Sequence, residues 1–204
     1  MGKLAKLSVL VGILLLIAGC SDKANQTGSA ATIGNRVIKQ KIVNEQLAEI
    51  LNDLPENSSQ QPAPDAGTIG QLVVSRLVIS DLVNEALVKL DTKVTDAEVI
   101  SLRDQIFLQY GQDAVIQQLA TTQGVPKSQI DSFFKTILGQ GYVGSALAPK
   151  GTQKQRSVAA ANYLTQLAAS EGVNVSPRYG TWDPQQMQAM GLDNSLSFSL
   201  STTQ

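Results

Sequence analysis

Thr68-Ile-Gly-Gln-Leu-Val-Val-Ser-Arg-Leu-Val-Ile-Ser-Asp-Leu-Val-Asn-Glu-Ala-Leu-Val-Lys-Leu90 is the longest apolar stretch of the chain after its first twenty residues. Most of its apolar residues recur at steps of three and four, which is the spacing of one face of an α-helix. Val74, Val78 and Ile79 fall outside that face, so a helix here is apolar on several sides. Such a helix is usually surrounded by others. We therefore predict that this stretch forms the central helix of the fold.

Helical patterns on both sides of this stretch predict a mainly α fold. Apolar residues at helical spacing precede Pro55, and similar patterns follow the central stretch. The expected helices cover residues 43–54, 95–111, 113–122, 126–138 and 153–170. Because the chain has 43% hydrophobic but only 4% aromatic residues, its core must consist mainly of Leu, Ile, Val and Ala.

Short strands are expected near both ends of this helical region. Ala31–Ile38 contains a Gly34-Asn35 turn signal and indicates a strand or small hairpin, and Val173-Asn-Val175 alternates like a strand. A strand at each end of a helical domain favours pairing between the two. The fold class that follows is a helical domain over residues 31–184, closed by a small β-sheet that joins its amino-terminal and carboxyl-terminal strands.

The clearest local signal is Val94-Thr95-Asp96-Ala97-Glu98-Val99. Thr95 and Glu98 have the spacing of a capping box, in which each side chain bonds the backbone amide of the other residue, and Val94 can pack on Val99. Asp96 and Glu98 also lie where the dipole of a helix favours negative charge. A capping role therefore accounts for both carboxylates, and a catalytic role is the weaker alternative.

The first residues have the layout of a secretory signal. Lys3 and Lys6 precede a short apolar run that ends in Leu16-Ile-Ala-Gly-Cys20. This ending looks like a bacterial lipobox, in which the cysteine is acylated and the signal is cut before it. We expect a signal peptide over residues 1–19, a lipidated Cys20 on the extracytoplasmic face of the cell membrane, and a flexible tether over residues 20–30. The alternative is a plain signal peptide with an incidental cysteine.

Composition excludes several classes of function. The chain has no histidine, so the nucleophile arrangements that depend on histidine are absent, and Cys20 is its only cysteine. Zinc or copper would have to be held by carboxylates alone, which suits neither metal. Removing Lys3 and Lys6 with the signal leaves 14 basic against 17 acidic residues, a balance that does not favour nucleic acid. The sequence predicts no enzyme, no cofactor and no metal.

Three segments are expected to lack regular structure. Residues 56–67 are polar and contain proline, and Gly139–Gly151 is rich in glycine without the spacing of a phosphate-binding loop. The latter is predicted to be a hinge or loose connection. Residues 185–204, rich in serine and threonine, are predicted to be a disordered polar tail.

The order of elements resembles the amino-terminal chaperone domain of SurA, which PrsA foldases and the substrate-binding arm of trigger factor share. The matching motifs are Ile33-Gly-Asn-Arg-Val-Ile38, Val94–Val99, Gly124-Val-Pro-Lys-Ser-Gln-Ile130 and Val173-Asn-Val-Ser-Pro-Arg-Tyr-Gly180. They span about residues 30 to 184. The ending Pro177-Arg-Tyr-Gly-Thr-Trp-Asp183 resembles that of SurA-like lipoproteins of actinobacteria.

The resemblance also identifies a missing part. In SurA and PrsA, prolyl isomerase domains of the parvulin type separate the helices that correspond to residues 129–138 and 153–170. Here that gap is residues 139–152, too short for a domain. Parvulin sites also use histidines, which this chain lacks. The resemblance therefore implies a chaperone-like lipoprotein without an isomerase domain.

Two functions remain open from the sequence. The first is a membrane-anchored chaperone that needs no ATP and holds newly exported, unfolded polypeptides. Its candidate contacts are Phe133, Phe134 and Tyr142, with Met187 and Met190 as adaptable additions, although each is more often a core or tail residue. Adjacent residues cannot share one narrow helix face, so one phenylalanine is expected in the core and the other at its rim.

The second function is an adaptor that binds one folded partner in the cell envelope. Arg178, Tyr179 and Trp182 would be its anchors, because these residue types are enriched at the centres of protein interfaces. Packing of the same residues as a strand against the opening strand is an equal alternative. The oligomeric state is left open.

Overall fold

The computed structural model describes residues 28–54 and 64–191 of the 204-residue chain. Its centre is helix α2 (Ala66–Lys89), which begins where the Asp65 carboxylate accepts a hydrogen bond from the Thr68 amide at 3.0 Å. Core residues such as Val74, Val78 and Leu82 are fully buried along it. The prediction of a central helix is confirmed. In the described part of the chain, α2 alone is long and apolar enough to cross a membrane, and half of its most apolar window is buried in the protein.

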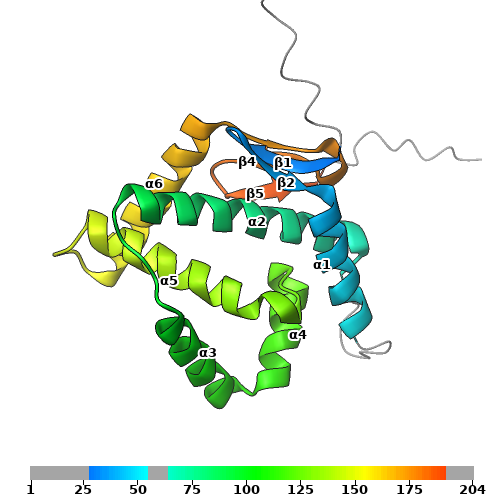
Figure 1. The fold of residues 1–204 in the computed structure, drawn as a ribbon, viewed down its shortest axis with the longest axis horizontal. Helices are drawn as coiled ribbons and strands as arrows, with labels where there is room; N and C mark the ends of the chain where they lie inside the picture. The colour runs from blue at the N-terminus through cyan, green and yellow to red at the C-terminus, as the bar shows by residue number, and fades with distance from the viewer. Residues whose placement is uncertain (1–27, 55–63, 192–204) are drawn as a thin grey trace, which may run out of the picture.

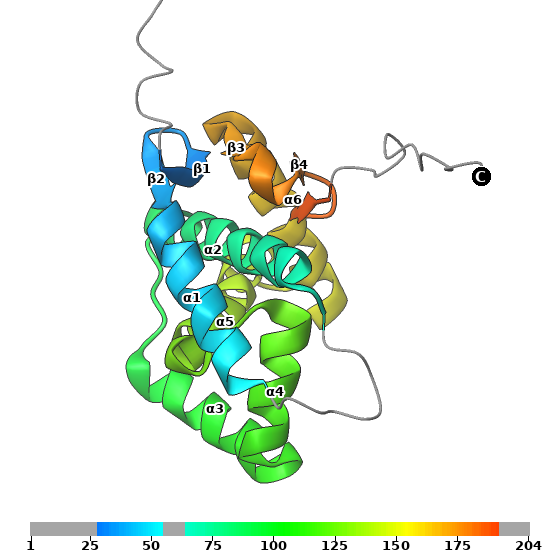
Figure 2. The ribbon, with the colours of Figure 1, turned by 90° about the vertical axis from the view of Figure 1, so that its right-hand side faces the viewer.

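The other helices pack around α2, and the described fold is mainly helical, as predicted. They are α1 (Gln40–Asp53), α3 (Asp96–Tyr110), α4 (Gln112–Gln123), α5 (Ile130–Leu147) and α6 (Gln153–Glu171). Helix α1 crosses one end of α2, and α5 runs beneath α2 with α3 and α4 below it (Figures 1 and 2). A short turn of 3-10 helix, Lys127–Gln129, leads into α5. The predicted capping box of α3 is present, with Thr95 and Glu98 as its partners.

Two small antiparallel sheets cover the opposite side of α2. Strands β1 (Ser29–Ile33) and β2 (Arg36–Lys39) form the expected hairpin, and β3 (Val173–Val175) pairs with the other edge of β1. In that pairing Ala31 lies opposite Val175 and Ile33 opposite Val173. The predicted joining of the two ends of the domain is confirmed. The second sheet is a hairpin of β4 (Thr181–Asp183) and β5 (Gln188–Met190).

Both ends of the domain extend further than the sequence suggested. Ser29 and Ala30, assigned to the tether, belong to β1, and Ala30 is fully buried. Gln188–Met190, assigned to a disordered tail, forms β5. This hairpin turns at Asp183, whose carboxylate accepts hydrogen bonds from the amides of the two residues beyond Pro184, at 2.8 and 3.1 Å. The signal peptide, Cys20 and residues 192–204 lie outside the described residues.

Most of the glycine-rich segment Gly139–Gly151 is helical, so the prediction of a hinge or loose connection is wrong for residues 139–147. Helix α5 continues through it to Leu147, and the connection to α6 is only residues 148–152. Two of the glycines allow close packing: a Cβ at Gly139 would lie 2.6 Å from Val83 Cγ1, and one at Gly144 would lie 2.5 Å from the Arg156 carbonyl oxygen. Their small size therefore brings α5 against α2 and α6.

Candidate functional site

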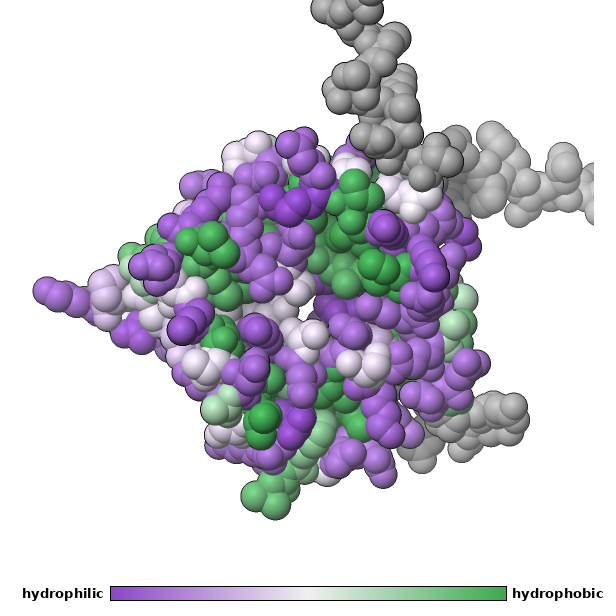
Figure 3. All heavy atoms as spheres, in the orientation of Figure 1, coloured by the Kyte–Doolittle hydropathy of each residue, from purple (hydrophilic) through white to green (hydrophobic). Residues whose placement is uncertain are grey.

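A groove lies between α2, α5, α6 and the β4–β5 turn on the described surface. It consists of two adjoining cavities of about 340 and 330 Å³. Ile79, Ile137, Gln140 and Met187 line both cavities, so we treat them as one site and call it the α2–α5 groove. Figure 3 shows that this face is hollowed near its middle, over the space between α2 and α5. Cavities of this size are typical of ligand sites.

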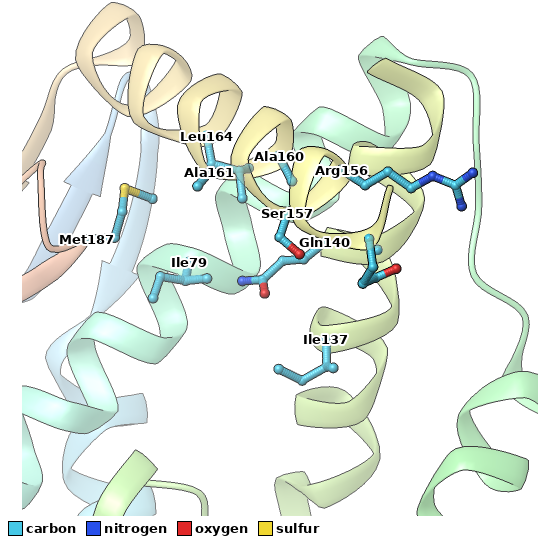
Figure 4. Close-up of a pocket in the computed structure, with 11 residues that line it drawn as sticks. Ile79, Ile137, Gln140, Arg156, Ser157, Ala160, Ala161, Leu164 and Met187 are labelled. Atoms are coloured by element: carbon cyan, nitrogen blue, oxygen red, sulfur yellow. The ribbon is translucent and has the colours of Figure 1, made fainter. Parts of the chain in front are cut away.

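The wall of the groove is apolar with uncharged polar groups between. Ile79 of α2, Ile137 of α5 and Met187 of the hairpin face the first cavity, together with Leu164 of α6 (Figure 4). Gln140 and Ser157 supply amide and hydroxyl groups. Ile137 remains 44% exposed in this wall. The groove can therefore offer both apolar contact and hydrogen bonds to a ligand.

The charged residues that line the two cavities are both arginines. Arg156 lines the first cavity with its stem, and its guanidinium points away (Figure 4) and donates to the Pro149 carbonyl at 2.9 Å. Arg76 lines the second cavity and is only 8% exposed. Its Nε donates to the Gly124 carbonyl at 3.1 Å, and its Nη2 donates to Gln46 Oε1. Burial lowers the pKa of Arg76 to about 10, so it stays charged at neutral pH.

Within residues 28–54 and 64–191, no group of three or more His, Cys, Asp or Glu side chains is arranged so that it could hold a metal ion. No family model, curated protein or solved structure matches the chain. What the groove does must therefore be derived from its own residues.

The structure places the predicted phenylalanines on two sides of α5. Phe134 is buried, with its ring 6.4 Å from that of Phe107 in an edge contact, so it is a core residue. Phe133 is half-buried and lines the second cavity of the groove. The expectation of one core and one rim residue is confirmed, and Phe133 alone of the two lies at the site. Met187 also lines the groove, whereas Met190 lies outside it.

Tyr142 lies away from the groove, on the side of α5 that faces α3. Its hydroxyl donates a hydrogen bond to Glu98 Oε1. Hydrogen bonds from the Thr95 hydroxyl, which has the larger effect, and from the Tyr142 hydroxyl lower the pKa of Glu98 to about 2. The hydrogen bond between Tyr142 and Glu98 also raises the pKa of Tyr142. Tyr142 therefore joins α5 to the first turn of α3, and its hydroxyl is occupied by this hydrogen bond within the domain.

The three predicted anchors for a folded partner do not form one exposed surface. Tyr179 is buried against Gly70 of α2, and its burial raises the pKa of its hydroxyl. Arg178 is exposed, with its guanidinium carbon 5.9 Å from the centre of the Tyr179 ring. Trp182 is half-buried, and its indole nitrogen has no hydrogen-bond partner among the described residues. Tyr179 is therefore a core residue, but it lies in a short 3-10 turn, Pro177–Tyr179, and packs on α2, not as a strand on the opening strand as the alternative had it.

Sequence reasoning assigned most of the groove to the core. Ile137 and Leu164 fit the apolar pattern of their helices, and nothing in that pattern separates a core face from a groove wall. The one available signal was Ile79, which lies outside the main stripe of the central helix. Arg76 was also missed, although a charged residue in the middle of so apolar a stretch was visible in the sequence.

Proposed function

We propose that this protein is a lipid-anchored chaperone of the SurA amino-terminal type, which holds unfolded exported polypeptides in the α2–α5 groove without ATP and without catalysis. The observation that carries the proposal is the open apolar groove, with Ile137 half-exposed in its wall. An unfolded chain offers apolar side chains and unpaired backbone groups together. The groove presents apolar walls beside the amide of Gln140 and the hydroxyl of Ser157, which suits both.

Two further features support a holding role. Met187, at the turn of the β4–β5 hairpin, lines both cavities, and methionine adapts its shape to varied apolar partners. The arrangement of helices closed by β1 and β3 agrees with the SurA-like order of elements. The proposed lipid on Cys20 would keep the groove near the membrane, where exported chains emerge, and so raise its effective concentration there.

Photo-crosslinking in bacterial cells tests this proposal on the full chain. Benzoylphenylalanine is placed at Ile137 in the groove or, as the control, at Val88, which is exposed on α2 and lines neither cavity. We expect Ile137 to crosslink to many polypeptides of different mass, and Val88 to crosslink weakly. A single discrete product from Ile137 would favour an adaptor with one folded partner. Equal crosslinking from both positions would contradict the groove as the site.

The anchor has its own test. Replacing Cys20 with serine removes the thiol that would carry the lipid, so the Cys20→Ser chain should retain its signal peptide uncut by a lipoprotein signal peptidase and lose its label from radioactive palmitate. A Ser21→Ala chain is the matched control and should be labelled like the wild type. Equal labelling of the Cys20→Ser chain would show that the lipid is not on this residue.

A further inference from the structure

The two arginines that line the α2–α5 groove differ in their partners from Arg36 and Arg103. Arg36 pairs with Asp81 at 2.7 Å and with Glu171 at 3.5 Å, and Arg103 pairs with Asp104 and Asp131 at 2.8 and 3.0 Å. Neither of these two lines the groove. Arg76 and Arg156 line it, and neither has a carboxylate within ion-pair distance among the described residues. No Asp or Glu lines either cavity.

Arg76 is the more informative of the two because it is more than nine-tenths buried. A guanidinium has five N–H groups. Two of them are engaged in the described structure, by the Gly124 carbonyl and the Gln46 side chain, both of which are neutral. Gly124 caps the carboxyl end of α4, so the helix dipole compensates part of the charge. A buried cation without an anionic partner is nevertheless costly, and an added carboxylate would form a charge-assisted hydrogen bond.

Resting on the proposed function, we infer that the groove prefers extended apolar polypeptide segments that carry an aspartate or glutamate. In this arrangement the apolar side chains of the segment lie against Ile79, Ile137 and Phe133, and its carboxylate pairs with Arg76 in the second cavity. A lysine or arginine at the same position would meet a like charge in a wall without any acid. The groove therefore selects among unfolded clients by charge.

The test measures binding of three fluorescent peptides to the full chain in nanodiscs of uncharged phosphatidylcholine. The peptides have the sequence Ser-Leu-Ser-Phe-X-Leu-Ser-Leu-Ser, with Glu, Gln or Lys at X, so that only one charge changes. We expect the Glu peptide to bind about tenfold more tightly than the Gln peptide, the usual effect of a hydrogen bond to a charged group. The Lys peptide should bind most weakly. Fluorescence anisotropy against empty nanodiscs gives the three dissociation constants.

Variants assign the preference to Arg76. Arg76→Gln should abolish the difference between the Glu and Gln peptides, and Arg76→Lys should keep part of it. Arg178→Gln is the matched control because Arg178 is exposed, has no carboxylate partner among the described residues and does not line the groove. It should leave the tenfold ratio unchanged. If Arg76→Gln does not fold, the wild-type ratio is measured in 0.5 M salt, where a buried pair persists and a surface attraction does not.

The outcomes separate this inference from the function on which it rests. Equal binding of the three peptides, weakened by Ile137→Ser, would overturn the charge preference and leave a groove for unfolded chains. A wild-type ratio that disappears in salt would also overturn it. Binding of none of the peptides would overturn both. If peptides bind only after residues 192–204 are deleted, the occupant is the chain's own terminal segment, and if a dimer excludes them, it is a second copy. Either result would refute the assignment to clients.

Discussion

At the scale of single residues, the three glycines in the middle of α5 have different surroundings. Adding a methyl group at Gly144 would bring it 2.5 Å from a backbone oxygen of α6, whereas nothing lies within 4 Å of a Cβ at Gly141. Gly144→Ala should therefore lower the free energy of unfolding by about 1–3 kcal/mol, because the helices must separate. Gly141→Ala is the matched control and should raise it by about 0.5–1 kcal/mol through helix propensity. Urea denaturation measures both, and equal effects would contradict close packing at Gly144.

The capping carboxylate of Glu98 should make stability depend on pH in the acid range. Its pKa is about 2 in the folded protein against an ordinary value of 4.5, so its contribution is complete above about pH 4.5 and is lost as the pH falls toward 2. The melting temperature of the wild type should fall over this range more steeply than that of Glu98→Gln. Tyr142→Phe removes one of the two side-chain donors to Glu98, so its melting temperature should fall with a slope between those of the other two proteins. Parallel curves for all three proteins would show that these hydrogen bonds do not couple to folding.

At the scale of elements, the β4–β5 hairpin depends on one buried hydroxyl of α2. Ser75 accepts a hydrogen bond from the Ala189 amide at 2.8 Å and donates to the Gln71 carbonyl at 2.7 Å. Ser75→Ala leaves the Ala189 amide without a partner, so we expect a loss of about 1–3 kcal/mol in unfolding free energy. The hairpin should also become more sensitive to limited proteolysis. Thr122→Ala removes an exposed hydroxyl that bonds only within its own helix, and this control should change stability little.

Most helices could be predicted from the sequence because their signals are local. The Thr95–Glu98 capping box and the Gly124 stop lie within a few residues of the ends they determine. The buried face of a helix is harder to predict from the sequence when the helix is rich in alanine. On α6, the spacing of Val158, Ala161 and Leu164 predicts that they share the inward face, yet Val158 is 50% exposed and Ala160 is buried. In this segment small residues on several faces fit the core equally well, so packing against α5 decides which face is buried.

The parts that the sequence did not predict depend on distant contacts. Strand β5 is three residues long and is held by Ser75, which precedes it by more than a hundred positions. The groove likewise requires Ile79, Ile137 and Met187 to meet from three elements. Each looks like an ordinary core residue in its own segment. Only the assembled helices show that Ile137 stays half-exposed at a cavity and that Arg76 is buried beside one.

At the scale of the whole molecule, Arg36 connects the β1–β2 hairpin with α2 and α6. It contacts Asp81 and Glu85 of α2 and Glu171 of α6. Burial alone would raise the pKa of Glu85, but hydrogen bonds with Lys89 and Glu171 and the charge of Arg36 outweigh it, so this pKa lies below its ordinary value. Lys89 alone would then remain to balance three carboxylates if Arg36 were removed.

Arg36→Ala should therefore destabilise the fold by about 1–2 kcal/mol at pH 7, a value reduced for the partial exposure of the arginine. The penalty should shrink as the pH falls below the ordinary 4.5 of Glu85 and through its lowered pKa in the fold, because protonation of Glu85 removes its attraction to Arg36. Thermal unfolding at pH 7 and pH 4 measures it. Lys41→Ala breaks an exposed pair with Glu45 and should cost less than about 0.5 kcal/mol. Equal losses in the two variants would mean that Arg36 does not join the elements.

The central position of β1 in its sheet affects how the domain resists a pulling force and when the sheet can be completed. Because β1 is paired on both edges, a pull transmitted along the chain from before Gly28 would act on two ladders at once, along the strands, and both must shear before the domain opens. One of those ladders needs residues 173–175, so it forms only after most of the 204 residues have been synthesised. Until then β1 can pair only with β2, because its second partner, β3, follows the last helix of the chain.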